Sequence, residues 1–202
     1  MILIVGADGS MGKRYQAILK HLNKEFKCAD VRDSTYSIEG WAKESEGVII
    51  ATPTETHCEF LLLLEGTKKP FLCEKPYSMI PKELEEIHWA RQRGLDITMM
   101  LQYQFLDNPS SSGPSHYNYF RHGSDGLVWD CFQIIGLARD EISIGESSPI
   151  WKCQLNGVEL RLGDMDKAYI MAVESWLRRE KQDFKAVMKM HEKVLKFNGS
   201  YV

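Results

Sequence analysis

The chain has 202 residues, of which 44% are hydrophobic, and its 25 basic residues are spread among 28 acidic ones. A chain of this length buries a full core in one or two compact units. No stripe of basic residues stands out, so we expect no nucleic-acid partner. The longest apolar block, residues 60–64, is too short to cross a bilayer, so we expect no membrane partner either.

Two further features favour a cytoplasmic protein. The five cysteines are odd in number, include no C-x-x-C pair and stand among apolar residues, as buried free thiols do in a reducing compartment. We assign no metal ligand. The apolar run at residues 1–5 is too short for the core of a secretion signal and has no basic leader.

The first half of the chain alternates short apolar runs with helical patterns. The runs predict strands at residues 1–5, 26–31, 48–51, 70–73 and 97–105. Helical spacing of apolar residues predicts helices over residues 11–22 and 55–64, and from Pro81, a residue that suits the first helical turn. This alternation predicts an α/β fold that begins with a Rossmann-like, doubly wound parallel sheet.

The second half has a different texture. Residues 106–115 are dense in Pro, Gly, Ser and Asn, which predicts a domain junction. Beyond it we expect a strand near residues 115–120, a helix over 127–138, and a hairpin over 151–162 turning at Asn156-Gly157. Two helices, near residues 167–181 and 183–197, end the chain. We therefore expect a first domain at residues 1–108 and a reduced α+β domain with antiparallel strands at 109–202.

Three glycines follow the first strand with the spacing G-x-x-G-x-x-G and open an amphipathic helix. In a dinucleotide-binding turn, one glycine permits the sharp bend, one lets the backbone approach a pyrophosphate, and one lets the helix pack on the strand. The N–H groups at the helix start attract phosphate. Strand, turn and helix in this order predict NAD or NADP binding. The candidate residues of the turn are Gly6, Asp8, Gly9, Ser10, Met11 and Gly12.

An acidic residue at the end of the second strand would accept hydrogen bonds from the adenosine ribose. Asp30 stands at close to the expected spacing from Gly6, and Asp33 is the alternative. Arg32 between them could contact a ribose 2′-phosphate, so both NAD and NADP remain open.

Two downstream motifs resemble a known family. The segments VIIATPTETH and CEKPYSM carry an apolar strand, A-T-P, a histidine four residues after the proline, and then E-K-P. This combination resembles the Gfo/Idh/MocA oxidoreductases, the family of glucose–fructose oxidoreductase and inositol dehydrogenase. The likeness covers residues 1–109 and thins afterwards.

The resemblance implies roles for individual residues. The loop Thr52, Pro53 and Thr54 would lie along the cofactor, and His57 would contact the cofactor or serve as a cap of the next helix. Lys75 would lie beside the nicotinamide and substrate, in a rigid turn before Pro76 with a cis bond. A lysine there can hydrogen-bond the reacting oxygen. Glu74 would hold the local backbone and balance charge, next to the cofactor.

The resemblance fails at one catalytic position. The family carries D-x-x-x-H on a helix of the second domain, and Asp130 matches the aspartate. Ile134 stands where the histidine would be, with Gln133 beside it, and neither moves a proton near neutral pH. Candidate substitutes lie just upstream, at His116, Tyr117, Tyr119 and His122. Lys75 could also act alone if burial lowers its pKa.

Two functions remain open on this sequence. One is an NAD(P)-dependent oxidoreductase that moves a hydride between nicotinamide and a sugar-like or cyclic small molecule. The other is a catalytically inactive nucleotide-binding sensor or partner-binding protein with the same fold. The segment between Asp30 and Val48 looks too brief for a full helix-plus-strand crossover, so we expect the adenine side to be trimmed. The apolar face of the hairpin needs a cover, which the helices or a homodimer could provide.

Overall fold

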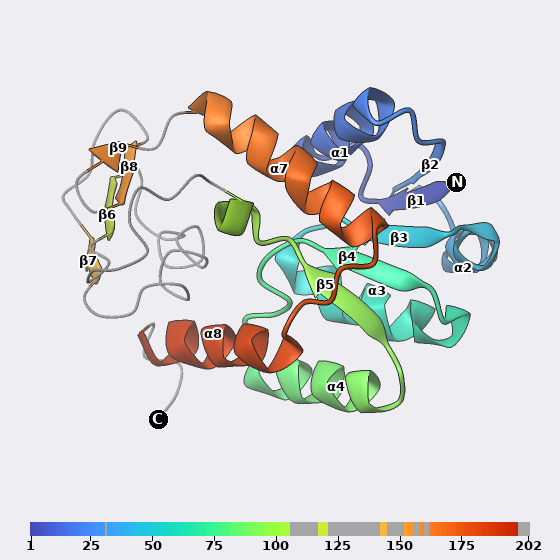
Figure 1. Cartoon of the computed structure of the whole chain (residues 1–202). Coiled ribbons are helices and arrows are strands. Elements are labelled where there is room, and N and C mark those ends of the chain that lie inside the picture. The colour runs from blue at the N-terminus through green and yellow to red at the C-terminus, as the bar shows by residue number, and fades with distance from the viewer. Residues whose placement is uncertain are drawn as a thin grey trace. The chain divides into compact units, whose positions relative to one another are not determined.

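The computed structural model describes residues 1–30, 32–105, 117–120, 142–144, 152–155, 158–159 and 162–197. The chain divides into two compact units (Figure 1). The first unit is Met1–Met100 with Val173–Gln182, and the second is Leu101–Ala172 with Asp183–Val202. The first unit thus takes up a segment from the C-terminal region, and the expected domain boundary at residue 108 stays a prediction.

The first unit is built on a five-stranded sheet in the order β2-β1-β3-β4-β5, and every neighbouring pair is parallel. The strands are β1 (Ile2–Val5), β2 (Phe26–Ala29), β3 (Gly47–Ile50), β4 (Pro70–Cys73) and β5 (Asp96–Met99). This confirms the expected α/β, Rossmann-like parallel sheet. No further strand of the described residues lies beyond β2.

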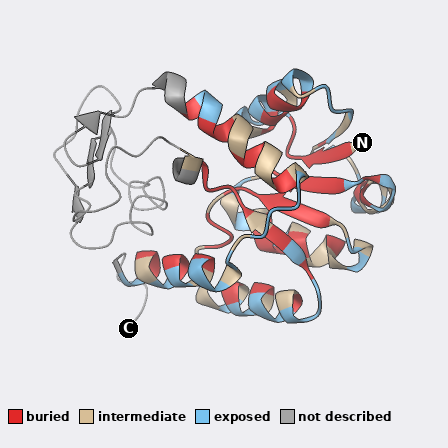
Figure 2. Ribbon diagram, viewed as in Figure 1, coloured by how far each residue is buried: buried red, intermediate tan, exposed pale blue. Residues whose placement is uncertain are grey.

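Burial follows the composition of each strand. Every residue of β1, β3 and β4 is buried, and these continuously apolar strands occupy the centre of the sheet (Figure 2). The edge strands β2 and β5 mix polar and apolar residues and are only partly buried. A strand covered on both faces needs apolar side chains throughout, whereas an edge strand does not.

Four helices connect the strands of this sheet. They are α1 (Ser10–His21), α2 (Thr35–Glu44), α3 (His57–Leu64) and α4 (Pro81–Gln92), with short 3-10 turns η1 (Thr54–Thr56) and η2 (Glu65–Thr67). Right-handed crossovers send α1 to one face and the other three to the opposite face. Figure 1 shows α1 and α4 on opposite sides, and α3 contacts both α2 and α4.

Two expected elements differ from the structure. The segment between Asp30 and Val48 does hold a full helical crossover, because Ser34 caps α2 by accepting from Ser37 N at 3.1 Å and the helix runs almost to β3. The last strand of the sheet is shorter than expected and ends at Met99. Residues 102–105 form a 3-10 turn, η3 (Gln102–Phe105), instead of continuing it.

The ends of three helices share one geometry. A residue with positive φ follows each helix. It is Asn23 after α1, Gly94 after α4, and Arg179 after α7 (Leu162–Leu177). The backbone N–H groups at and after it bond back into the last helical turn, as in the Schellman motif. We expected the last of these helices to reach residue 181, but the left-handed Arg179 ends it earlier.

The segment after α7 forms hydrogen bonds with the edge strand β5 and with the residue before β3. The side-chain amide of Gln182 accepts from Met99 N at 2.8 Å and donates to Met99 O at 3.0 Å. Arg179 Nη2 donates to Glu46 O at 2.9 Å. An edge strand leaves main-chain groups unpaired, and the Gln182 amide pairs with two of them.

The second unit is described in part. Four short strands, β6 (Tyr117–Phe120), β7 (Ile142–Ile144), β8 (Lys152–Leu155) and β9 (Val158–Glu159), lie in the order β7-β6-β8-β9. β6 pairs parallel with β7 and antiparallel with β8, which pairs antiparallel with β9. The expected helix over residues 127–138 and the turn at residues 156–157 lie outside the described residues. The expected antiparallel architecture of this part stays a prediction.

Helix α8 (Phe184–Phe197) matches the expected last helix, and Asp183 caps it by accepting from Ala186 N at 3.1 Å. Among the described cysteines, Cys58 and Cys73 are buried as expected, but Cys28 is exposed because it lies on the edge strand β2. No helix in the described ranges is long and apolar enough to cross a membrane.

Candidate functional site

The motif segments lie at the carboxyl ends of three neighbouring strands, and we call this side of the sheet the edge that carries the candidate site. Gly6 follows β1, Ala51 follows β3, and Glu74 follows β4. The ladders continue into these residues, since Ala51 N donates to Val5 O at 2.8 Å and Glu74 N donates to Ile50 O at 3.0 Å. The connection after β1 runs to β2 on one side, whereas the connection after β3 runs to β4 on the other side. Such a switch point is where open α/β sheets bind ligands.

Two glycines of the turn are required by the backbone itself. Gly6 has φ +87°, and a Cβ there would lie 2.7 Å from Ala51 O and Thr52 N. A Cβ on Gly12 would lie 2.1 Å from Gly6 O. These glycines let the turn approach β3 and let α1 pack on the turn.

Gly9 is different, because the protein leaves room for a side chain there. A Cβ on Gly9 would make ordinary contacts, 3.4 Å from Gly6 O and 3.9 Å from Ala51 O, and its φ of −69° suits any residue. Within the described residues, no side chain caps the first turn of α1 and no acidic residue stands in it. The N–H groups at this helix start are therefore open to an external anion.

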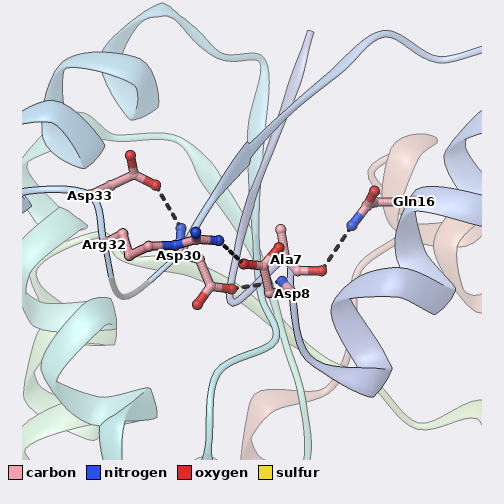
Figure 3. Close-up of polar contacts among 6 residues, drawn as sticks. All are labelled: Ala7, Asp8, Gln16, Asp30, Arg32 and Asp33. Atoms are coloured by element: carbon pink, nitrogen blue, oxygen red, sulfur yellow. Dashed lines mark hydrogen bonds and ion pairs between the residues drawn. The ribbon is translucent and has the colours of Figure 1, made fainter.

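The acidic residues after β2 lie against the glycine turn (Figure 3). Asp8 N donates to Asp30 Oδ2 at 2.7 Å, and Arg32 Nη2 donates to Asp8 Oδ2 at 2.8 Å. Asp33 Oδ2 instead accepts from Asp30 N at 2.9 Å. Of the two candidate ribose ligands, Asp30 thus borders the turn, while Asp33 stabilises the local backbone.

The buried pair of Tyr15 and Glu74 joins the glycine-turn helix to the E-K-P turn. Tyr15 Oη donates to Glu74 Oε1 at 2.6 Å, and the two residues are 0% and 5% exposed. Glu74 Oε2 accepts from Lys75 N at 3.2 Å. These contacts turn the Glu74 carboxylate inward, and its expected place next to a cofactor stays a prediction.

Lys75 is the second residue after β4 and is half-buried. The Lys75–Pro76 peptide bond is cis, as the resemblance implies. The turn lies next to the loop after β3, because β3 and β4 are paired neighbours. With strands about 4.8 Å apart, the ends of β1 and β4 lie about 10 Å apart across the edge.

The loop after β3 carries an unsatisfied polar atom. Within the part of the chain that the structure describes, the buried Thr52 Oγ1 has no hydrogen-bond partner. Thr54 is half-buried and Pro53 is exposed. A buried hydroxyl without a partner is uncommon and is consistent with a ligand that completes its hydrogen bonding.

His57, expected at the cofactor, is turned inward. It is 1% exposed, with Nδ1 2.7 Å from Pro76 O and Nε2 2.9 Å from Thr52 O. Both ring nitrogens therefore face backbone carbonyls, and contact between His57 and a cofactor stays a prediction.

No protein-family model matches the sequence, and no curated protein matches it. The WlbA (WbpB) dehydrogenase from Thermus thermophilus, in complex with NAD and UDP-GlcNAcA, has a similar structure with a TM-score of 0.74 and 12% identity. The match covers 97% of this chain and 94% of that chain.

Two further solved structures are similar. A Gfo/Idh/MocA family oxidoreductase from Vibrio cholerae has a TM-score of 0.70 at 11% identity, with coverage of 96% of this chain and 94% of that chain. The chain has the fold of the Gfo/Idh/MocA oxidoreductases. Biliverdin reductase from Synechocystis sp. PCC 6803, in complex with biliverdin and NADP+, has a TM-score of 0.68 at 10% identity, with 98% of each chain covered. The resemblance is thus confirmed at the level of the fold.

The catalytic helix expected from the Gfo/Idh/MocA resemblance is not placed. Asp130, Gln133 and Ile134 lie outside the described residues, as do His116 and His122. Tyr117 and Tyr119 are in β6, where only the backbone is described.

Two residues make contacts at this edge of the sheet that the sequence did not predict. Tyr15 falls within the predicted helix over residues 11–22, and a buried tyrosine hydroxyl generally finds a partner. Gln16 Nε2 donates to Ala7 O at 2.8 Å and so holds the glycine turn from α1 (Figure 3). Nothing in the local pattern signals either contact.

The thiols near the edge are poor nucleophiles. Burial raises the pKa of Cys73 well above its usual value, and the neighbouring Glu74 charge raises it further. Burial likewise raises the pKa of Cys58 to about 12, assisted by Glu83 and Glu86. Both thiols stay protonated near neutral pH, so neither offers a reactive thiolate.

A cavity of about 380 Å³ lies elsewhere in the first unit, at the amino ends of β4 and β5. Its basic side chains include Arg91 and Arg179, which bond to Leu95 O and Glu46 O. It shares no residue with the glycine turn, the loop after β3 or the E-K-P turn. The candidate functional residues therefore lie at the other end of the strands, where β1, β3 and β4 finish.

Proposed function

We propose that this protein is an NAD(P)-dependent oxidoreductase. It moves a hydride between nicotinamide and the hydroxyl- or carbonyl-bearing carbon of a sugar-like or cyclic small molecule. One observation carries the proposal: the glycine turn, the loop after β3 and the Lys75 turn meet at the switch point of one sheet, and the buried Tyr15–Glu74 bond joins two of them. Structures of the same fold contain NAD or NADP+, which supports it.

The residues at this edge fit a dinucleotide. Gly9 leaves space beside the uncapped start of α1, where backbone N–H groups of residues 10–12 would bind the pyrophosphate. Asp30 would accept from an adenosine ribose hydroxyl, and Arg32 would contact a 2′-phosphate. Thr52 Oγ1 would gain the partner it lacks among the described residues. When bound, the nicotinamide would supply or accept the hydride.

Lys75 carries the proposed chemistry. Its ammonium group would donate a hydrogen bond to the reacting oxygen and stabilise negative charge that develops there. Glu74 would fix the turn that presents it, since its carboxylate accepts from both Tyr15 and Lys75 N. Asp130 would assist from the second domain.

The alternative function is a nucleotide-binding sensor or partner-binding protein without catalysis. The isoleucine at position 134, where the resemblance implies a proton-transferring histidine, is the observation that favours it. Both functions require cofactor binding, so turnover separates them.

The deciding experiment measures nicotinamide absorbance on a broad panel of polyols and sugars. We expect turnover, and we expect Lys75→Ala to lower kcat by about 100- to 1,000-fold. Lys69→Ala, just before the opposite end of β4, is the matched control and should leave kcat unchanged. Cofactor binding without turnover on the whole panel would favour the sensor, and full activity in Lys75→Ala would exclude the role of this lysine.

We also propose that residues 1–108 bind the cofactor while residues 109–202 shape the substrate site and pair two copies into a cytoplasmic homodimer. The second sheet, which pairs strands at 117–120, 142–144, 152–155 and 158–159, supports an interface there. Light scattering of the purified chain should give twice the monomer mass of 23.2 kDa. A monomer mass across the micromolar range would contradict the dimer.

A further inference from the structure

His57 links two loops of the candidate site. It is the first residue of α3, directly after the loop that leaves β3. Its Nε2 lies 2.9 Å from Thr52 O in that loop, and its Nδ1 lies 2.7 Å from Pro76 O in the turn after β4. The ring therefore spans the loops that carry Thr52 and Lys75.

The hydrogen-bond chemistry of these contacts sets the protonation of the ring. A backbone carbonyl oxygen can only accept, so each ring nitrogen must donate for both bonds to form. A neutral imidazole has one N–H, whereas the imidazolium has two. The distances of 2.7 and 2.9 Å are both hydrogen-bond lengths, so each contact calls for a donor on the ring.

Acidic residues belong to the segments on either side of the ring. Glu74, 5% exposed, stands two residues before Pro76 on the same turn, and its oxygens accept from Tyr15 Oη and Lys75 N. Helix α4 packs against α3 as well. The other ionisable side chains of the neighbouring segments are Glu55, Cys58 and Glu59 at the ring's own helix start, Lys75 and Tyr77 on the turn, and Lys82, Glu83, Glu85, Glu86, His88 and Arg91 on α4.

We propose that His57 is a positioning residue, which carries a proton on each ring nitrogen and thereby holds the Thr52 loop and the Lys75 turn at a fixed spacing. The consequence for function rests on the proposed cofactor site, because those loops would contact the nicotinamide end of the dinucleotide. A neutral ring would leave one of the carbonyls without a donor and release one loop from the other.

Nitrogen-15 NMR of the histidine rings tests the protonation directly in the cofactor-free protein. At pH 7 we expect both nitrogens of His57 to show an attached proton. His191, whose Nδ1 contacts Val187 O and whose pKa burial lowers to about 4, should show one protonated nitrogen and serve as the internal reference. The signals of His57 are assigned by their absence from His57→Gln, or by through-bond correlation if that variant does not fold. One unprotonated nitrogen on His57 would overturn the proposal.

Cofactor affinity tests the positioning role. We expect His57→Gln to raise the Kd of the nicotinamide cofactor by about tenfold or more, because misplaced loops lose aligned contacts. His88→Gln, an exposed histidine on α4, is the matched control and should leave Kd unchanged. A folded His57→Gln protein with wild-type Kd would overturn the role. If the wild type binds no cofactor, the proposed function fails, while the NMR result still decides whether His57 forms the link.

Discussion

The hydroxyl of Tyr15 donates a 2.6 Å hydrogen bond to Glu74 Oε1, and both side chains are buried. Tyr15 lies on the helix that begins at the glycine turn, and Glu74 begins the turn that presents Lys75. A single buried bond therefore connects the proposed phosphate-binding end of the edge to the proposed catalytic lysine.

Removing this bond should weaken both stability and the geometry of the edge. Tyr15→Phe leaves a buried carboxylate oxygen without its donor, which should lower the free energy of unfolding by about 1–3 kcal/mol. Urea titration of the two proteins measures the difference. Tyr36→Phe, a change at a residue that is 86% exposed, serves as the control and should have no measurable effect. Equal stability of Tyr15→Phe and the wild type would show that the bond contributes little.

Replacing two glycines of this turn by alanine should have different effects, with Gly12→Ala lowering stability and Gly9→Ala lowering cofactor affinity. Gly12→Ala places a Cβ 2.1 Å from Gly6 O and should lower the free energy of unfolding by about 1–3 kcal/mol or more. Gly9→Ala meets only ordinary contacts, so the fold should tolerate it. We expect Gly9→Ala instead to weaken nicotinamide-cofactor binding, since the added methyl group fills the space left for the pyrophosphate. Unfolding curves and calorimetric Kd values for the pair separate packing from binding, and unimpaired binding in Gly9→Ala would contradict the site.

Arg32 should influence the choice between the two dinucleotides. Its ion pair with Asp8 is solvent-exposed, with 84% and 61% of the side chains accessible, so Arg32→Ala should change stability by less than about 1 kcal/mol. If Arg32 contacts the 2′-phosphate, the variant should raise the Kd of NADP(H) by about tenfold and leave that of NAD(H) nearly unchanged. Lys43→Ala on α2 is the control. An unchanged ratio of the two Kd values would remove Arg32 from the site.

The buried His191 should make the protein sensitive to acid. Burial lowers its pKa from 6.5 to about 4 despite the bond to Val187 O. Between those pH values the unfolded chain binds a proton that the folded chain does not, so this contribution is fully present above pH 6.5 and is lost as the pH falls towards 4. At 1.36 kcal/mol per pKa unit, the full contribution is about 3 kcal/mol.

Urea unfolding at pH 7.5 and pH 5 measures this contribution. In the wild type we expect about 2 kcal/mol of the loss in unfolding free energy to come from His191. His191→Leu should lack that part of the loss, whereas the exposed His88→Leu should retain it. The same pH dependence in His191→Leu as in the wild type would contradict the assignment.

The sequence predicts the centre of the sheet well because burial on both faces demands continuous apolar runs. The strands at residues 2–5, 47–50 and 70–73 are such runs. The same signal overextends β5, since Met100 and Leu101 are 0% and 2% exposed without belonging to a strand. An apolar run indicates that residues are buried, but it does not show where the backbone hydrogen bonds of a strand stop.

Helix ends and the inner contacts of the site were harder to predict. Glycine marks the end of α4, but Arg179 takes the same left-handed conformation after α7 without any sequence signal. The motifs place Lys75 and His57 at one edge, yet pattern alone cannot show that His57 turns its nitrogens inward or that Tyr15 reaches Glu74. Those contacts depend on three-dimensional neighbours that are far apart along the chain.

Calorimetric titration of the purified protein with NAD+, NADH, NADP+ and NADPH tests the central claim most directly. The account predicts that at least one of the four binds with a single-site isotherm, and that Gly9→Val, which fills the space beside the start of α1, abolishes or strongly weakens that binding while the protein remains folded. Absence of binding by all four forms to the wild type would contradict the dinucleotide site and the oxidoreductase built on it.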